Sequence, residues 1–308
     1  MSTIEAARTL SARSIVWARR RISLAAFWRA YRSDREGMLG LCLLVLFAVV
    51  ALGAPLFSDA EGLRVTKATG PVLAGPSLQY PFGTDDAGRS VLTLVIWGSR
   101  ISLLVGLTAT IISMVIGTLV GIGAGHFRGI IGGGLNRLTE WFLVIPYLPL
   151  AIVLATVFPP DVPKIIAVII VIGVTGWSST ARLVRAQALS IEERPFLERA
   201  RALGAGHWHQ MSRHVLPNVM PLVLANTTLT VSLAILAETT LSFLGLGDPL
   251  RISWGRILDQ AYSGAVISTG SWWWVFFPGL GVVLVVLAFN LCGRAMERIL
   301  DPRLKERA

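Results

Sequence analysis

Six long apolar stretches constrain the fold of this chain more than any other feature of its sequence. Each has roughly the ~20 residues that a helix needs to cross the hydrocarbon core of a bilayer. Only 15% of the residues are charged, against about 25% in a typical soluble domain. The sequence therefore predicts an all-α polytopic membrane protein with six transmembrane helices, at 39–57, 101–125, 138–158, 165–184, 219–245 and 273–292.

The basic residues indicate how these spans are oriented. Six spans place both termini on one side, and Lys and Arg concentrate in loops on the cytoplasmic side. Of the 28 Lys and Arg, 21 lie in the N-terminal tail, in 126–137, in 182–214 and in the tail from Gly293. We therefore expect cytoplasmic N and C termini. Topology and attraction to anionic lipid head groups account for the basic surplus, so no nucleic-acid partner is expected.

The same signals divide the chain into segments. The first apolar run is long for the core of a cleaved signal peptide, so we expect it to be retained as a span. In the outer loop, Thr84 or Asp86 is suited to begin a short helix as its N-cap. The expected segments are a cytoplasmic tail (1–38), the first transmembrane helix (39–57), an extracytoplasmic loop (58–100), a core transmembrane domain (101–292) and a second cytoplasmic tail (293–308).

Two features within the spans predict their packing. Gly117, Gly121 and Gly125 recur every four residues, which makes a ridge of small residues that another helix can approach closely. Pro146 and Pro149 remove backbone donors from the third span and should kink it. A kinked helix can line a pathway, but it is also a common packing device.

Catalytic motifs are missing from the sequence. The only lysines are Lys67, Lys164 and Lys305, and none completes a phosphate-binding G-x-x-x-x-G-K-[ST] loop. There is no G-x-S-x-G elbow and no H-E-x-x-H pair. A cluster at 207–214 contains three histidines but no nearby fourth ligand, so we expect no metal site. The chain is expected to be non-enzymatic, with no cofactor of its own.

Two polar residues in the fifth span are candidates for a translocation pathway. Glu238 lies in the middle of that span, where a charge costs about 3 kcal/mol on insertion scales. It must face the interior of the bundle, be paired or be protonated. Asn226 is a second candidate on the same grounds of burial cost. The alternative for Glu238 is an interhelical hydrogen bond to Ser, Thr or Asn.

The segment 190–217, between the fourth and fifth spans, carries the most information. Strong helix formers precede Gly204, which can end a helix in the left-handed conformation. Trp208, Met211 and Val215 then share one stripe of a second helix, which Leu216-Pro217 should stop. Such a helix pair either supports the bundle at the interface or docks a cytoplasmic partner, and spacing alone does not separate the two.

The residues of this segment resemble a known signature. Glu198-Arg199-Ala200, then Gly204, then nine residues and His214-Val215-Leu216-Pro217 are similar to the E-A-A-x3-G-x9-I-x-L-P loop of permease subunits in ATP-binding-cassette importers. The residues at 201–205 and 213–218 resemble those of the C-type permease of the dipeptide and oligopeptide branch. Five other stretches agree with this branch: 82–85, 100–106, 181–185, 241–247 and 288–291. The resemblance therefore covers about residues 25 to 303.

This resemblance implies a type I importer permease in the bacterial plasma (inner) membrane. The implied complex has a second homologous permease subunit, two ATP-binding subunits that bind ATP and Mg²⁺, and an extracytoplasmic solute-binding protein. The loop would couple to an ATPase through Glu198, Arg199, Ala200, Leu203, Gly204, His214, Leu216 and Pro217. The chain departs from the pattern at Arg199, where Ala is usual, at Ser90, where Asp is usual, and at Gly293-Arg294, where Gly-Asp is usual.

The cargo stays open at this point. Similar permeases serve peptides, nickel complexes, glutathione or heme. A self-contained secondary carrier matches the gross size and charge, but the threefold P-x-[DE]-x-x-[KR] repeat of mitochondrial carriers is missing.

Overall fold

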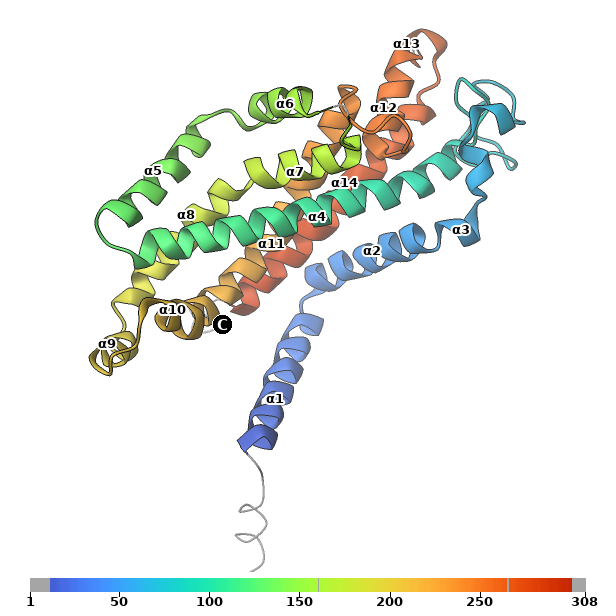
Figure 1. Cartoon of the computed structure of the whole chain (residues 1–308). Coiled ribbons are helices and arrows are strands. Elements are labelled where there is room, and N and C mark those ends of the chain that lie inside the picture. The colour runs from blue at the N-terminus through green and yellow to red at the C-terminus, as the bar shows by residue number, and fades with distance from the viewer. Residues whose placement is uncertain (1–11, 160, 265, 301–308) are drawn as a thin grey trace, which may run out of the picture.

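A computed structural model describes residues 12–159, 161–264 and 266–300, and shows a bundle of long helices (Figure 1). The predicted tails extend beyond these residues at both ends. The α-helices of the described residues are α1 (Ala12–Ser33), α2 (Arg35–Leu52), α3 (Ala54–Phe57), α4 (Val91–His126), α5 (Ile130–Val144), α6 (Tyr147–Val157), α7 (Lys164–Thr175), α8 (Trp177–Glu192), α9 (Pro195–Ala202), α10 (His207–Gln210), α11 (Leu216–Phe243), α12 (Trp254–Ser263), α13 (Val266–Thr269) and α14 (Trp273–Leu300).

The candidate spans agree with the predicted fold class. Within the described residues, five helical stretches are long and apolar enough to cross a membrane: α2, α4, 164–192, 207–243 and 273–299. The pair α5 and α6 makes a sixth candidate if it is taken as one bent span. The all-α polytopic prediction is therefore confirmed.

The third span is broken instead of gently kinked. Its helices α5 and α6 meet at 93°, and the break falls at Ile145, whose backbone is extended at ψ 126°. The residue before a proline is driven out of the helical region by the proline ring, so Pro146 causes the break. Pro149 lies in the first turn of α6, where its missing N–H leaves no hydrogen bond unmade.

Helix α4 is the central helix of the bundle and packs along α8. Glycine has no Cβ, and a Cβ built at any of three glycines would lie 2.6 to 2.7 Å from an atom of α8: Gly117, Gly121 and Gly125. At Gly121 that atom is the Ala181 carbonyl oxygen. The backbones of α4 and α8 therefore approach at these positions more closely than any side chain would allow.

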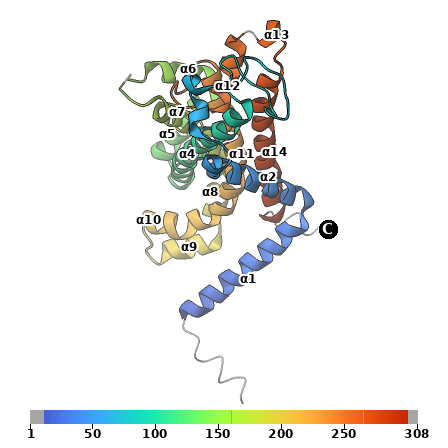
Figure 2. The same cartoon turned by 90° about the vertical axis from the view of Figure 1, so that its right-hand side faces the viewer.

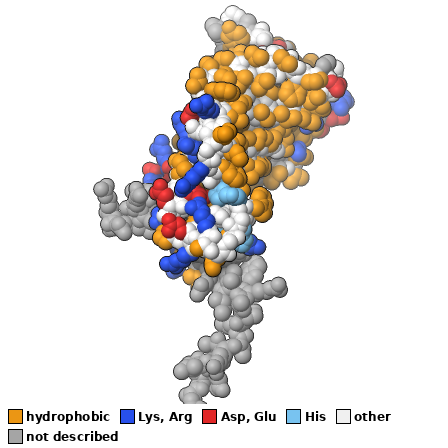
Figure 3. All heavy atoms as spheres, turned by 60° about the vertical axis from the view of Figure 1, so that its left-hand side comes forward, with side chains coloured by type: hydrophobic (Ala, Val, Ile, Leu, Met, Phe, Trp, Pro, Cys, Tyr) orange, Lys and Arg blue, Asp and Glu red, His pale blue; other side chains and the backbone are white. Residues whose placement is uncertain are grey.

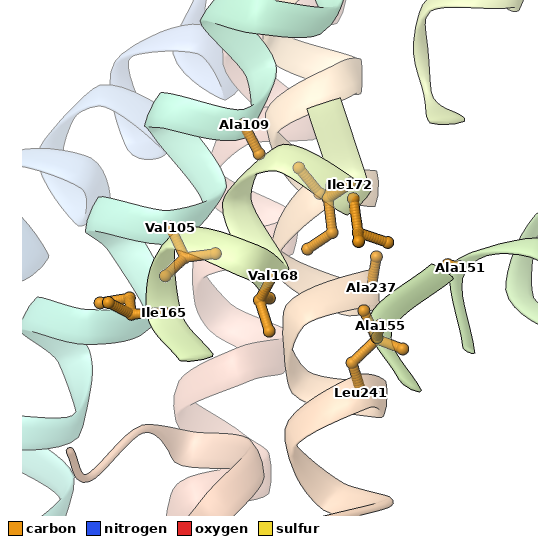
Figure 4. Close-up of a cluster of buried hydrophobic side chains, with 11 residues drawn as sticks. Val105, Ala109, Ala151, Ala155, Ile165, Val168, Ile172, Ala237 and Leu241 are labelled. Carbon is orange, nitrogen blue, oxygen red and sulfur yellow. The ribbon is translucent and has the colours of Figure 1, made fainter. Parts of the chain in front are cut away.

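A buried apolar cluster holds α6 against the bundle (Figure 4). Ala151 and Ala155 of α6 pack with side chains of α7 and α11, among them Val168 and Leu241. The small side chains of α6 let it lie close to its neighbours, so the bend is backed by a packed core.

The loop between α3 and α4 ends in a turn that leads into α4. Asp85 is fully buried, and its Oδ1 accepts hydrogen bonds from the backbone N–H groups of Ala87 and Arg89. The Thr84 hydroxyl donates to the carbonyl of Pro71, and no helix begins at Thr84 or Asp86. The predicted N-cap is therefore wrong, because Thr84 bonds across the loop and Asp85 closes a turn.

The N-terminal helices are joined to the C-terminal helix. Helix α1 projects from the bundle (Figures 1 and 2), while α2 packs on α14. The Tyr31 hydroxyl is buried and donates to the Gly37 carbonyl at 3.0 Å, and burial raises its pKa. Arg298 of α14 forms ion pairs with Asp34 and Glu36, which fixes the start of α2.

Candidate functional site at residues 190–217

The segment 190–217 lies at one end of the bundle, and α12, α13 and the loop between α3 and α4 lie at the other (Figure 2). Helix α9 begins at Pro195, where a proline is well tolerated, and ends at Ala202. Gly204 then takes φ +80°, and the Ala205 N–H donates to the Ala200 carbonyl at 3.0 Å. The left-handed glycine expected at this position is therefore found.

The second half of the segment differs from its prediction. Leu216-Pro217 does not stop the helix, because α10 passes through a π turn, η4 (Met211–Val215), directly into α11. The Leu216 N–H donates to Met211, five residues back. A proline in a regular α-helix clashes with the carbonyl four residues earlier, and the wider π turn accommodates Pro217 without ending the helix.

This continuity changes which side chains share a face. Val215 is fully buried, whereas Trp208 is 76% exposed, so the stripe expected for Trp208, Met211 and Val215 does not face one surface. The extra residue of the π turn rotates the residues on either side of it relative to each other. The segment is thus a direct extension of a membrane span.

One face of the segment is buried against the bundle, and the opposite face is exposed. Leu197 is fully buried with Val215 in one apolar cluster. Leu203 is 88% exposed, and Figure 3 shows charged and histidine side chains gathered at this end below the apolar flank of the bundle. Of the predicted coupling residues, Glu198, Arg199, Leu203, Gly204 and Pro217 are exposed, and Ala200, His214 and Leu216 are partly buried.

A polar cluster, buried at His126, Glu192 and Gln210, lies beneath the segment and was not predicted from the sequence. His126 Nδ1 lies 2.6 Å from Glu192 Oε1, and His126 Nε2 lies 2.9 Å from His207 Nδ1. Arg201 donates to the second oxygen of Glu192 and, through Nε, to Gln210 Oε1 at 3.2 Å. These five residues, called the polar cluster below, join the ends of α4 and α8 to α9 and α10.

The two polar candidates of the fifth span form interhelical hydrogen bonds. Glu238 is 1% exposed and accepts from the hydroxyls of Ser102 on α4 at 2.8 Å and Ser242 at 2.7 Å. The Asn226 amide donates to the Thr180 hydroxyl on α8 at 3.1 Å. Neither residue lines the cavity described next, so this geometry corresponds to the packing alternative for Glu238.

A cavity of about 500 Å³ lies where α5 and α6 bend. Helices α4, α7, α8 and α11 form its other walls. Its lining mixes apolar side chains with hydroxyls, which include Thr110, Ser113, Tyr147, Thr175 and Thr230. Sequence reasoning named the prolines of this bend but not the cavity, because its walls come from four separate spans.

Comparison with known proteins decides the family. Residues 117–306 match the family described as binding-protein-dependent transport system inner membrane component. The chain belongs to this family. The match begins at the glycine ridge of α4 and includes the polar-cluster residues of α8, α9 and α10.

Full-length relatives support the same assignment for this permease. It is 36% identical over 281 residues to the dipeptide transport system permease protein DppC of Bacillus subtilis. This alignment covers 90% of this chain and 85% of that protein. It is 33% identical over 279 residues to the oligopeptide transport system permease protein OppC of the same organism, covering 90% and 88%. For the di/tripeptide transport system permease protein DppC of Pseudomonas aeruginosa the identity is 34% over 290 residues, covering 92% and 94%.

The resemblance drawn from the 198–217 signature is therefore confirmed. This permease is a transport subunit of the ATP-binding-cassette importer class in the bacterial inner membrane.

Proposed function

We propose that this permease is one of two permease subunits of an ATP-driven importer and that its 190–217 segment docks on an ATP-binding subunit. The observation that carries the proposal is the exposure of Leu203 and Trp208 beside Glu198 and Arg199. Large apolar side chains that gather in water are a common mark of a protein interface. The position of the segment at one end of the bundle supports a partner outside the membrane.

In this proposal the nucleotide chemistry belongs to the partners. ATP and Mg²⁺ bind in two ATP-binding subunits, and this chain transmits their movement without catalysing a reaction. Helix α10 runs into α11 through η4, and the polar cluster ties α9 and α10 to α4 and α8. These spans form walls of the 500 Å³ cavity. A displacement of the segment therefore moves walls of the cavity. Such movement is required for a change between two conformations of the transport pathway.

The proposed cargo is a small peptide delivered by an extracytoplasmic solute-binding protein, with a second homologous permease completing the pathway. The names of the relatives, which refer to dipeptide, oligopeptide and di/tripeptide transport, support this class. The cavity lies in the size range of small-ligand sites and has apolar walls with several hydroxyls. Uptake of labelled dipeptides compared with nickel, glutathione and heme separates the cargo classes.

Leu203→Asp tests the docking surface. The side chain is 88% exposed, so the variant should fold, while a charge in an apolar contact should weaken docking by about 2 kcal/mol or more. Co-purification of the ATP-binding subunits and ATP-dependent uptake in proteoliposomes should both fall. Leu78→Asp is the matched control, because Leu78 is fully exposed in the outer loop.

Full uptake by the Leu203→Asp complex would refute docking through this segment. Uptake by the single purified chain without any ATP-binding subunit would refute the whole proposal in favour of a self-contained carrier. Binding of the cargo by the solute-binding protein should be unchanged in every variant.

A further inference from the structure

A second cavity, of about 910 Å³, opens at the end of the bundle opposite the 190–217 segment. Helix α2 runs beside the first half of α4 (Figure 1), and the cavity lies between them, closed by the loop after α3 and the residues around the start of α12. It shares no lining residue with the 500 Å³ cavity. Five arginines line it and, in the described part of the chain, no acidic side chain does: Arg64, Arg89, Arg100, Arg251 and Arg256.

Two of these arginines are neutralised by buried or half-buried partners. Arg89 pairs with Asp85 at 2.6 Å and also donates to the Gln260 side chain. Arg256 pairs with Asp259 at 2.6 Å, although its Nε is buried without a hydrogen-bond partner among the described residues. These two side chains are therefore held in place by the fold.

The other three arginines are poorly compensated. Arg251 approaches Asp248 only to 3.8 Å. Arg64 and Arg100 have no side-chain hydrogen bond or ion pair with any residue that the structure describes, and the Arg100 guanidinium lies over the Trp97 ring at 5.1 Å. The cavity thus presents at least two positive charges without an acidic partner among the described residues, and these favour an anionic ligand.

Below the arginines the walls become apolar. Leu52 of α2 lines the cavity and is largely exposed, and Leu104 and Leu107 of α4 line it and are nearly half exposed. From Arg100 the exposed side of α4 continues at helical spacing along Leu104, Leu107, Ile111, Val115 and Leu119. A ligand that fills this site must combine an anionic group with a long apolar chain.

The depth of Arg100 agrees with such a ligand. Helix α4 has 36 residues and is therefore about 54 Å long, against about 30 Å for the hydrocarbon core of a bilayer. About 24 Å of the helix exceeds that core, and an equal division between the two sides leaves about 12 Å at each end. Arg100, about 14 Å from the start of the helix, then falls near the boundary of the core.

We propose that this cavity binds an anionic phospholipid, with its phosphate between Arg64 and Arg100 and an acyl chain in the groove between α2 and α4. A peptide carboxylate would satisfy the charge but leave the apolar groove uncovered. The site does not depend on the docking role of the 190–217 segment, so each proposal can fail alone.

Native mass spectrometry of the purified importer complex tests the site. Phosphatidylglycerol and phosphatidylcholine with identical acyl chains are offered in equal amounts, and the complex should retain phosphatidylglycerol preferentially. Each arginine contributes about fivefold to the binding of an anionic lipid, so Arg64→Gln with Arg100→Gln should reduce the preference about 25-fold. The conservative pair Arg64→Lys with Arg100→Lys should keep most of it.

Lys67→Gln with Lys164→Gln is the matched control, because it removes the same charge from the same expected side of the membrane and both lysines lie outside the cavity. An equal loss in this control, or no preference in the unmodified complex, would overturn the proposal. So would an unchanged preference in the Arg64 and Arg100 glutamine variant.

A photo-crosslinking residue at Leu107 separates the remaining occupants. A lipid adduct that depends on Arg64 and Arg100 supports the proposal. Crosslinking to another protein subunit shows that the groove is a protein interface, and competition by an acidic peptide shows a cargo site. Either result would overturn the lipid assignment.

Discussion

His126 Nδ1 and Glu192 Oε1 lie 2.6 Å apart where the ends of α4 and α8 meet under the 190–217 segment. Both side chains are buried, and the second oxygen of Glu192 accepts from Arg201 of α9. A buried carboxylate is costly unless it is paired, and Arg201 supplies a partner for Glu192 from α9. The position of the 190–217 segment is therefore linked to the ends of α4 and α8.

The first prediction concerns Glu192→Gln. The variant removes the negative charge that Arg201 faces, and it should lower the local stability of α9 by about 1 to 2 kcal/mol, because Arg201 is itself partly exposed to water. Hydrogen exchange of residues 195–202 should then be about tenfold faster. ATP-dependent uptake should fall with it.

Glu193→Gln is the control for this prediction. Glu193 is the exposed neighbour of Glu192 and has no ion pair among the residues described. Equal exchange rates for α9 in the two variants would show that the polar cluster does not hold the segment.

The second prediction uses two glycines of the segment that differ only in backbone conformation. A Cβ at Gly204 or at Gly206 would meet nothing within 4 Å, but Gly204 has φ +80° and Gly206 has φ −68°. Gly204→Ala should therefore destabilise the turn by about 1 kcal/mol, while Gly206→Ala should not. Protease cleavage between α9 and α10 reports the difference, and equal cleavage would contradict the role of the left-handed turn.

The spans were predictable because the bilayer imposes length and apolarity on each of them separately. The bounds of the helices were less predictable where glycines lower the hydrophobicity of the sequence. Helix α5 begins at Ile130, eight residues before the predicted start, and its first turns contain Gly132, Gly133 and Gly134. The continuation of the helix through Pro217 was not predictable, because a proline usually ends a helix and the sequence contains no local signal for the π turn before it.

The candidate site was predictable only where its signal is local. Gly204 follows from neighbouring residues, whereas His126 and Glu192 are 66 positions apart. Arg64, Arg100 and Arg251 are likewise scattered in the sequence, and only the fold brings them to one cavity. A single sequence contains no record of such pairings.

The third prediction concerns the close contact of α4 and α8. Gly121→Ala places a methyl group 2.6 Å from the Ala181 carbonyl oxygen, so the helices must separate. Overpacking of this kind costs about 1 to 3 kcal/mol. The thermal midpoint of the purified protein in detergent should fall, whereas Gly133→Ala, with open space at its Cβ, should leave it within error. A midpoint that stays unchanged in Gly121→Ala would show that α8 can move away without loss.

The last prediction separates packing from transport at Glu238. Glu238→Gln preserves the size of the side chain and an oxygen that accepts a hydrogen bond. The hydroxyls of Ser102 and Ser242 can each rotate to donate or accept, and the Trp254 N–H keeps its bond to the Ser102 oxygen. Uptake and thermal midpoint should therefore stay close to those of the unmodified protein.

Glu238→Leu is expected to lower both the thermal midpoint and uptake. It leaves two buried hydroxyls without their acceptor, at a cost of about 1 to 3 kcal/mol for each unsatisfied group, so the thermal midpoint should fall and uptake with it. The informative contrast is between the two variants: if Glu238→Gln abolishes uptake at an unchanged midpoint, the carboxylate acts in transport itself. Retained uptake in Glu238→Gln together with a lowered midpoint in Glu238→Leu assigns Glu238 to the joining of α4 and α11.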